Sequence, residues 1–495
     1  MTSLLDPLFR TDAMREIFSD RGRLQGMLDF EAALARAEAR TGVIPKAAAP
    51  AIGAQCQAKL FDIEALVRGA VPAGNTAIPM VKALTALVEK RDKAAAGYVH
   101  WGATSQDAMD TGLVLQLRSA LDLVDADVVR LSDALARLAE KYKKTPMAGR
   151  TWLQQALPIT FGLKLAGALS AIERHRARLR EMRARVLVIQ FGGAAGTLAS
   201  LGGRGLDVAK ALAVELTLGE PDIPWHAHRD RVAEVATTLG LLVGTLGKIA
   251  RDVSLMMQTE IGEAFEPAAV GKGGSSTLPH KRNPVGAAVV LAAATKVPAL
   301  VSVMLSAMVQ EHERGFGNWH AEWETLPEIC MLSAGALGQV VQMIEGLEID
   351  TARMRHNLDA TYGLILAEAV SAALAPKLGR EAAHGLIEEA CRRAVEQSKP
   401  LRDVLAKDAK VGQLLSVTDL DRLFDPANYL GVAQQMVDRV LAACTRTLQN
   451  EKRSPQRTRI PSRIPYVRGT SEYPSSVEYP FRTQRKSKDE KSGTT

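Results

Sequence analysis

Apolar residues recur at alternating steps of three and four positions in the middle of the chain. The longest run comprises Val232, Val235, Leu239, Leu242, Leu246, Ile249, Val253 and Met256. This spacing places all its members on one side of an α-helix, which would extend about 35 Å at 1.5 Å per residue. The pattern predicts one long helix whose apolar seam needs partner helices.

A second run with the same spacing lies upstream. Its members are Leu165, Leu169, Ile172, Leu179, Met182, Val186 and Ile189. In the first run, Gly240, Gly244 and Gly247 would let a neighbouring helix approach closely. Long helices with such seams pack nearly parallel, so we expect a central helical bundle.

Other segments fit the same picture. Residues 20–40 predict a helix that stops at Thr41-Gly42. Residues 110–143 contain few Gly or Pro and predict either a helix pair or one long helix. Residues 262–284 are rich in Gly, Ser and Pro and predict a loop, whereas residues 350–450 predict short helices joined by polar turns.

Composition favours helices and locates the excess charge. Hydrophobic residues make up 47% of the 495 residues and aromatic residues only 4%, as in helical cores of Ala, Leu and Val. Most of the net charge of +7 comes from residues 451–495, which hold 11 Lys or Arg against 5 Asp or Glu. The body is nearly neutral and gives no electrostatic reason to expect a nucleic acid partner. We expect the tail to be a disordered extension, with a partner-binding tail as the alternative.

Features that bear on cellular location point to the cytoplasm. The four cysteines are far apart in the sequence and are expected to be reduced thiols: Cys56, Cys330, Cys391 and Cys444. Residues 1–10 lack a basic region followed by an apolar stretch, which argues against a secretory signal. Residues 283–310 are strongly apolar, but Lys296 and Pro298 interrupt them, so we expect buried core helices and no membrane span.

Three segments carry clustered polar residues. They are HWGATSQD at 100–107, GRTWLQ at 149–154 and GSSTLPHKRNP at 274–284. Taken singly, each has a structural explanation, such as a helix N-cap at Thr104-Ser105, a turn, or a solvated hinge.

Together and in this order, the three segments resemble the signature regions of the fumarase/aspartase superfamily. The third is similar to its Gly-Ser-Ser-x-Met-Pro-x-Lys-x-Asn motif, with Leu278 in place of Met. Within the superfamily, residues 14–448 resemble bacterial 3-carboxy-cis,cis-muconate cycloisomerases. That resemblance is carried by MREIFSD at 14–20, GNTAIP at 74–79, QFGGA at 190–194, EHER at 311–314 and WHAEWETLP at 319–327.

The resemblance implies an all-α, fumarase/aspartase-like fold with a long central helical bundle flanked by two smaller helical domains. We expect an N-terminal helical domain over 1–110, the bundle with its signature loop over 111–350, a C-terminal helical domain over 351–450 and the basic tail over 451–495. The resemblance further implies a homotetramer in which three different subunits contribute the three signature regions to each active site. It implies no cofactor.

The second segment departs from the pattern of the superfamily's lyases. Those enzymes usually have histidine where this chain has Trp152, and adenylosuccinate lyases carry a Lys-His-Asp element near residues 74–76 that is absent here. An indole neither accepts nor delivers a proton near neutral pH. Lactonisation tolerates this loss, because the nucleophile is a carboxylate of the substrate that is already ionised, and folding the diene brings it to the alkene carbon. Trp152 would then supply an apolar wall.

The resemblance assigns the proton chemistry to the third segment. Ser275 corresponds to the serine proposed as the base for carbon deprotonation, and by microscopic reversibility it would act as the acid in an addition. Lys281 is the candidate to stabilise the serine anion and the negative charge that grows on the substrate. His280 is the alternative proton donor, and Asn283 is expected to orient the same carboxylate.

A tricarboxylate substrate requires further donors. The resemblance points to Asn75, Thr104, Ser105, Gln106, Thr151, Gln154 and Arg314. The guanidinium of Arg314 suits a carboxylate, and the alternative is a surface ion pair with Glu311 or Glu313. His100 is equally consistent with a structural role and with a substrate contact.

The reaction implied by the resemblance is the lactonisation of 3-carboxy-cis,cis-muconate to 4-carboxymuconolactone in protocatechuate (β-ketoadipate) catabolism. No metal is implied, since His226 and His228 beside Asp230 have no second ligand pair. Two alternatives are an adenylosuccinate-lyase-like C–N lyase that releases fumarate, and a non-catalytic helical scaffold whose tail binds nucleic acid or another partner.

Overall fold

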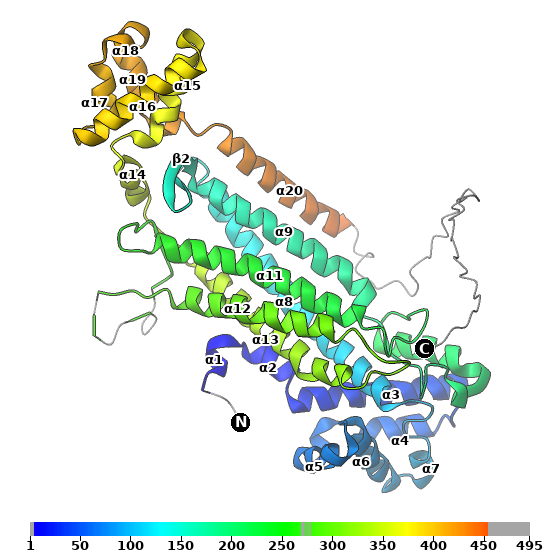
Figure 1. The fold of residues 1–495 in the computed structure, drawn as a ribbon. Coiled ribbons are helices and arrows are strands. Elements are labelled where there is room, and N and C mark those ends of the chain that lie inside the picture. The colour runs from blue at the N-terminus through cyan, green and yellow to red at the C-terminus, as the bar shows by residue number, and fades with distance from the viewer. Residues whose placement is uncertain (1–3, 269–272, 275–276, 279, 454–495) are drawn as a thin grey trace, which may run out of the picture. The chain divides into compact units, whose positions relative to one another are not determined.

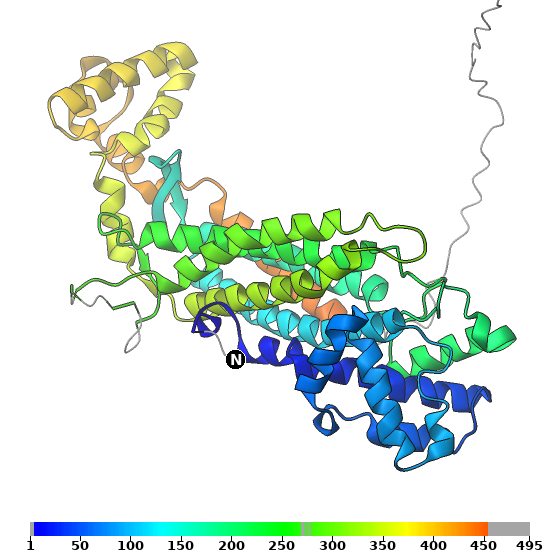
Figure 2. The same ribbon diagram turned by 60° about the horizontal axis from the view of Figure 1, so that its bottom comes forward.

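The computed structural model describes residues 4–268, 273–274, 277–278 and 280–453, which are predominantly helical. Five long helices lie alongside one another as a bundle (Figure 1): α8 Ser105–Lys141, α9 Phe161–Val186, α11 Asp230–Met256, α12 Val285–Ser306 and α13 Asn318–Glu345. Figure 2 shows the same helices side by side from a second direction. The predicted all-α fold with a long central bundle is confirmed.

The helices of the bundle follow the apolar seams closely. All eight seam residues of α11 are buried, which confirms the helix predicted from their spacing. Residues 110–143 form one long helix rather than a pair, since α8 continues without a break to Lys141. The second seam is confirmed as far as Val186, whereas Ile189 is buried in the loop beyond α9.

Short elements connect these helices. β1 Pro146–Thr151 and β2 Gln154–Thr160 form an antiparallel hairpin between α8 and α9. η2 Ala199–Arg204 and α10 Gly205–Leu216 lie between α9 and α11, and β3 Ala264–Phe265 follows α11.

The N-terminal region packs on the bundle through α3, Asp20–Thr41, which runs against α8. The Ser19 hydroxyl accepts a hydrogen bond from Gly22 N at the start of α3, and Gly42 ends it with φ at 75°, a conformation that glycine adopts without steric cost. The predicted helix and its stop are therefore confirmed. The other elements are α1 Asp6–Phe9, α2 Asp12–Ile17, α4 Ala48–Gln55, η1 Ala58–Leu60, α5 Ile63–Ala73, α6 Ala77–Glu89 and α7 Lys93–Ala96.

The region after α13 consists mainly of short helices, as predicted. They build a separate small core around Val370, Leu374 and Leu405. The elements are β4 Glu348–Ile349, α14 Thr351–Asp359, η3 Leu364–Leu366, α15 Ala367–Leu378, α16 Arg380–Glu396, α17 Leu401–Ala406, α18 Ala409–Leu414, α19 Val417–Leu423, η4 Pro426–Asn428 and α20 Ala433–Arg453. α20 is longer than expected and packs against α9. Residues 454–495 of the predicted tail lie outside the described residues.

Two helices of the bundle are long and apolar enough to cross a membrane by length and composition, α11 and α12. Most of the apolar stretch of α11 is buried, whereas its Leu241 is 56% exposed. In α12 only one side is buried within this chain, and Val303 and Leu305 on its other side are 41% and 48% exposed. Residues 283–310, expected to form buried core helices, are therefore only partly buried within one chain, because no described element covers the outer side of α12.

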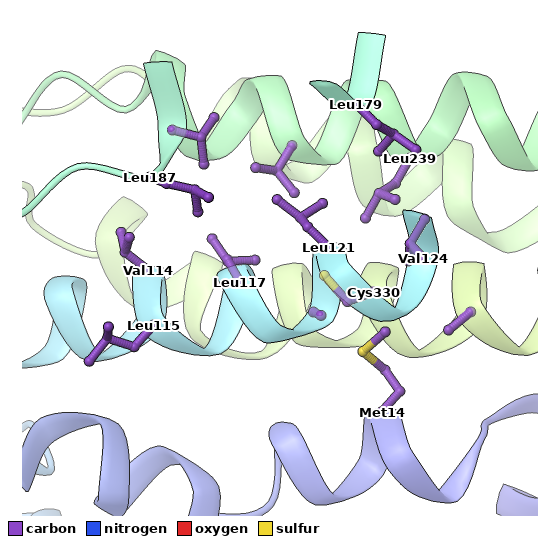
Figure 3. Close-up of a cluster of buried hydrophobic side chains, with 14 of the residues drawn as sticks. Met14, Val114, Leu115, Leu117, Leu121, Val124, Leu179, Leu187, Leu239 and Cys330 are labelled. Atoms are coloured by element: carbon purple, nitrogen blue, oxygen red, sulfur yellow. The ribbon is translucent and has the colours of Figure 1, made fainter. Parts of the chain in front are cut away.

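An apolar core and one ionic cluster hold α8, α11 and α13 together. Figure 3 shows Leu117 and Leu121 of α8 near Leu239 of α11 and Cys330 of α13. Arg229, directly before α11, is almost fully buried. Its guanidinium donates to Asp110 of α8 at 2.6 Å and to Glu322 of α13 at 2.5 Å. Each of these charges is compensated by the others, so the cluster fixes three helices at one point.

Two further buried carboxylates lie on one side of α3. Glu31 Oε1 contacts His100 Nδ1 at 2.6 Å, whereas neither carboxylate oxygen of Glu38 has a hydrogen-bond partner in the described part of the chain. Burial, with a smaller contribution from the nearby Glu31 charge, raises the pKa of Glu38 to about 9. The Glu38 side chain is therefore protonated at neutral pH in the folded protein.

Replacing Arg229 with methionine leaves the buried Asp110 and Glu322 without their cation. We expect a loss of about 3–5 kcal/mol in the free energy of unfolding, the cost of breaking a buried ion pair from one side. Urea denaturation measures this loss. Arg130→Met, which removes an exposed ion pair with Glu345, is the control and should change stability little. Equal effects of the two substitutions would contradict the assignment.

Glu38→Gln should make stability less dependent on pH. The folded-state pKa of Glu38 lies above its unfolded value, so between about pH 4.5 and 9 the folded state holds one more proton than the unfolded state. Stability is therefore lost as pH rises through this window, by at most about 1.4 kcal/mol per pH unit. Denaturation at pH 5 and pH 8 should show a smaller loss for Glu38→Gln than for the wild type, whereas the exposed control Glu64→Gln should keep the wild-type loss.

Candidate active site

The first signature segment leads into the N-terminus of α8. Thr104 and Ser105 are half-buried there, where the helix dipole favours a negatively charged ligand. Gln106 is fully buried, and its Nε2 donates to Asp110 Oδ2 at 3.0 Å and to the His226 carbonyl at 2.9 Å. The structure thus places the two hydroxyls at the helix end and Gln106 beneath them, where its amide supports the turn.

The carboxylate of Asp107 organises this turn. It is fully buried and lies 2.8 Å from His226 Nε2. It also accepts hydrogen bonds from Thr104 N, Gln190 Nε2, Gly192 N and Gly193 N at 2.9–3.2 Å. These contacts attach the 190–193 segment to the start of α8. Asp107 and His226 are therefore positioning residues. Neither was predicted as a site residue from the sequence, although the spacing Thr104-x-x-Asp107 is that of a capping box.

Arg314 reaches the same helix end from the segment before α13. Its Nη1 donates to Thr104 Oγ1 at 3.1 Å and its Nη2 to the Ala194 carbonyl at 2.9 Å. The alternative of an ion pair with Glu311 or Glu313 is not found among the described residues. Arg314 Nε is buried and forms no hydrogen bond with the residues that the structure describes. The guanidinium therefore places positive charge directly beside Thr104.

Asn75 and His100 lie in the loops before α6 and α8. Asn75 Oδ1 accepts from Ala77 N and Ile78 N, both at 3.1 Å, and so caps α6. Its Nδ2 group donates to no described residue. His100 has a φ of 58° and contacts the buried Glu31, which raises the pKa of the imidazole against the opposing effect of burial. This contact gives His100 a structural role in holding the loop on α3.

The second signature segment forms the tip of the β1–β2 hairpin. Trp152 and Leu153 are the two turn residues, with φ of 53° and 64°, and they are 97% and 79% exposed. Positive φ at two bulky residues is strained, and such strain persists where a site requires a particular side chain. Thr151 and Gln154 flank the turn and are also exposed. The hairpin thus presents residues 151–154 outward.

The base of the hairpin is anchored beside the third signature segment. Arg150 makes a bidentate ion pair with the fully buried Glu263, at 2.7 and 2.9 Å, and Asn357 Nδ2 donates to the same carboxylate at 2.8 Å. Glu263 directly precedes β3, which leads into the signature loop. The second and third signature segments are therefore tied to the same end of the bundle.

The signature loop has well-defined ends. Asn283 N donates to the Gly273 carbonyl at 2.8 Å, and a side chain at Gly273 would clash with Asn283 O. Arg282 pairs with Glu348 at 2.9 Å. His280 and Lys281 are exposed, and Asn283 is half-buried. Ser275 lies outside the described residues.

The first signature segment is far from the other two within one chain. Thr104 and Thr151 lie at opposite ends of α8, and its 37 residues span about 55 Å at 1.5 Å per residue. Lys281 and Arg314 flank α12, whose 22 residues span about 33 Å. A small substrate cannot reach both ends, so one chain contains two separate groups of predicted site residues.

Metal-ligand geometry is absent from the described part of the chain, where no three His, Cys, Asp or Glu side chains lie close enough to hold an ion. His226 is engaged with Asp107 instead. The four cysteines form no disulfide, and burial raises the pKa of each thiol, including partly buried Cys391.

Comparison with known proteins identifies the family. Residues 9–299 match the family described as Lyase, and residues 363–440 match the one described as Adenylosuccinate lyase C-terminus. The chain is 62% identical over 439 residues to the 3-carboxy-cis,cis-muconate cycloisomerase of Pseudomonas aeruginosa, covering 89% of this chain and 96% of that protein. It is 55% identical to the protein of the same name from Bradyrhizobium diazoefficiens, covering 90% and 99%.

Solved structures agree. The crystal structure of 3-carboxy-cis,cis-muconate lactonizing enzyme from Pseudomonas putida superposes with a TM-score of 0.87 at 57% identity, covering 90% of this chain and all of that one. Family match, sequence identity and fold all agree with the three signature segments. The chain therefore belongs to this lyase family, the fumarase/aspartase superfamily.

Proposed function

We propose that this protein is an intramolecular lyase that closes 3-carboxy-cis,cis-muconate into 4-carboxymuconolactone. The observation that carries the proposal is the high identity, over nearly their whole length, to enzymes named for this reaction. The same similarity, at 62% and 55% identity to enzymes named for this reaction, favours cycloisomerisation over the alternative of a C–N lyase that releases fumarate.

The proposed reaction needs no external nucleophile. A carboxylate oxygen of the substrate attacks an alkene carbon and forms the C–O bond of the lactone, while the electron pair of the double bond moves to the adjacent carbon. That carbon receives one proton, and no atom leaves, so the product is an isomer. Negative charge develops on the carboxylate next to the protonated carbon, and the site must stabilise it.

The described side chains supply the charges that this reaction requires. Arg314 and the N-terminus of α8 place positive charge beside the Thr104 hydroxyl, which suits one substrate carboxylate. Exposed Lys281 is free to approach the developing charge, with Ser275 or His280 as the proton donor. The exposed indole of Trp152 would exclude water from the diene face. The hairpin tip carries no acidic or basic side chain that could transfer a proton in place of Ser275 or His280. Its residues are Thr151, Trp152, Leu153 and Gln154.

A homotetramer would reconcile these roles with the two distant groups of residues in each chain. Antiparallel packing of copies brings the Thr104 end of one bundle to the Trp152 and Lys281 end of another. The strained, exposed tip at Trp152 and Leu153 supports this arrangement, because exposed bulky side chains of this kind suit a contact with a second chain.

The uncovered side of the bundle supports the same assembly. A groove of about 930 Å³ runs over α9, α11 and α12, with Gly167 and Gly244 leaving open space for another helix. Lys164, Lys248 and Asp252 also line it. Charged groups are costly against lipid, so we propose copies of this chain and not a membrane as the cover.

The remaining expectations belong to the same proposal. They comprise the domain division at residues 110, 350 and 450, a cytoplasmic location and a place in protocatechuate catabolism. We also propose that the substrate is a tricarboxylate and that the reaction uses no cofactor. Neither a nucleic acid nor a membrane is proposed as a partner.

Purified protein should consume 3-carboxy-cis,cis-muconate, and loss of the ultraviolet absorbance of the conjugated diene measures the rate. Lys281→Met should lower kcat by about 100-fold or more, because it removes the charge that opposes the developing anion. Ser275→Ala should do the same if Ser275 donates the proton.

Lys90→Met, at the exposed C-terminal end of α6, is a matched control and should retain activity. Absence of any absorbance change with wild-type protein between pH 6 and 8 would refute the proposed reaction. Release of fumarate from adenylosuccinate would favour the C–N lyase instead.

A further inference from the structure

A cavity in the N-terminal region adjoins the predicted substrate residue Asn75. It has a volume of about 430 Å³ and is bounded by α3, α5, the Asn75 loop and α13. Apolar side chains form most of its wall, among them Met27 and Val67. A small extension of the cavity reaches Met109 and Asp110 of α8, about one turn beyond Ser105 and Gln106. The cavity therefore lies next to the first signature segment.

Arg23 lines both the cavity and its extension. Its Nη2 donates to the Trp323 carbonyl at 2.6 Å, and no carboxylate in the described part of the chain lies within ion-pair distance of it. Burial lowers the pKa of this guanidinium, and the more distant charges of exposed Asp20 and Glu324 offset this only in part. A largely buried cation without an anion beside it is energetically costly, so a missing anion would explain its position.

Trp323 also lines the cavity, and its indole contains a second donor without a described partner. The Trp323 Nε1 atom is buried and forms no hydrogen bond with any described residue. Buried indole N–H groups normally find a partner, because an unsatisfied donor costs about 1–3 kcal/mol. The ring itself is held in place by edge contacts with Trp319 and His320.

Polar groups of the Asn75 loop complete the set. Asn75 Oδ1 is used to cap α6, which leaves its Nδ2 as a donor, and the Thr76 hydroxyl has only a weak contact with Met27 Sδ at 3.8 Å. The available groups at this end of the cavity are thus a guanidinium, an indole N–H, an amide NH₂ and a hydroxyl. Asp20, which is exposed to solvent, is the one acidic residue on the wall of the larger cavity, and Asp110 on the wall of the extension pairs with Arg229.

We propose that Arg23 and the Trp323 indole bind one carboxylate of the substrate in this cavity. Arg23 is then a specificity-determining residue that selects the tricarboxylate, and the apolar walls accept the carbon chain attached to that carboxylate. The inference rests on the proposed function, since it names the groups that hold the substrate of that reaction.

Steady-state kinetics of the full-length enzyme with 3-carboxy-cis,cis-muconate test the assignment. Arg23→Met should raise KM about tenfold or more and change kcat less, as expected for a lost charge-assisted hydrogen bond in binding. Arg21→Met, an exposed arginine on the same helix, is the matched control and should keep the wild-type KM. Unchanged KM in Arg23→Met would overturn the inference and leave the proposed function intact.

Trp323→Phe removes the indole N–H, which has no partner among the described residues, and keeps an aromatic ring beside Trp319 and His320. It should raise KM about threefold or more at an unchanged melting temperature. A KM equal to that of the wild type, in a folded protein, would exclude the indole as a donor and count against the assigned cavity.

Direct binding separates this inference from the proposed function. Calorimetric titration with propane-1,2,3-tricarboxylate should give a Kd at least tenfold weaker for Arg23→Met than for the wild type, even if neither turns over the diene. The same compound should inhibit the wild-type reaction competitively. Equal Kd values, or inhibition that is not competitive, would overturn the inference, and the second result would mark the cavity as a separate anion site.

Discussion

The length of α8 determines how this protein can work. α8, with 37 residues about 55 Å long, separates Thr104 from the hairpin that carries Thr151, so the two signature segments of one chain cannot meet on one small substrate. α12, about 33 Å long, likewise lies between Lys281 and Arg314. A site that uses all three segments therefore has to be built from several copies of the chain. Contacts between such copies would bury the uncovered side of α12 and the exposed hairpin tip.

Buried charges keep each end of the bundle in a fixed geometry. At one end, Asp107 collects donors from the 190–193 segment and His226, while Arg229 joins Asp110 to Glu322 a turn below. At the other end, Glu263 holds Arg150 and therefore the hairpin. These groups take no part in the proposed chemistry. They position the backbone that presents hydroxyls and an indole to the substrate, which suits a reaction that depends mainly on orienting a flexible anion.

Sequence periodicity predicted the helices well because each long helix buries a regular seam, as α11 does without exception. The signature segments predicted where polar groups cluster, because each segment is a short continuous stretch of the sequence. Contacts across the fold left weaker traces: nothing in the spacing of Arg23, Trp323 and Asn75 indicates that they share a cavity, since α3, α13 and the loop before α6 meet only in the folded chain. Sequence likewise gave no sign that Gln106 would face inward or that α12 would lack a cover.

Complementation between inactive chains tests the shared site most directly. An Arg314→Met chain and a Lys281→Met chain, each first shown to be inactive alone, are co-expressed with different tags and isolated as a mixed oligomer. The account predicts that the mixed oligomer regains diene-consuming activity, because some of its sites draw an intact Arg314 from one chain and an intact Lys281 from another. A mixed oligomer of verified composition that stays as inactive as its parents would contradict it.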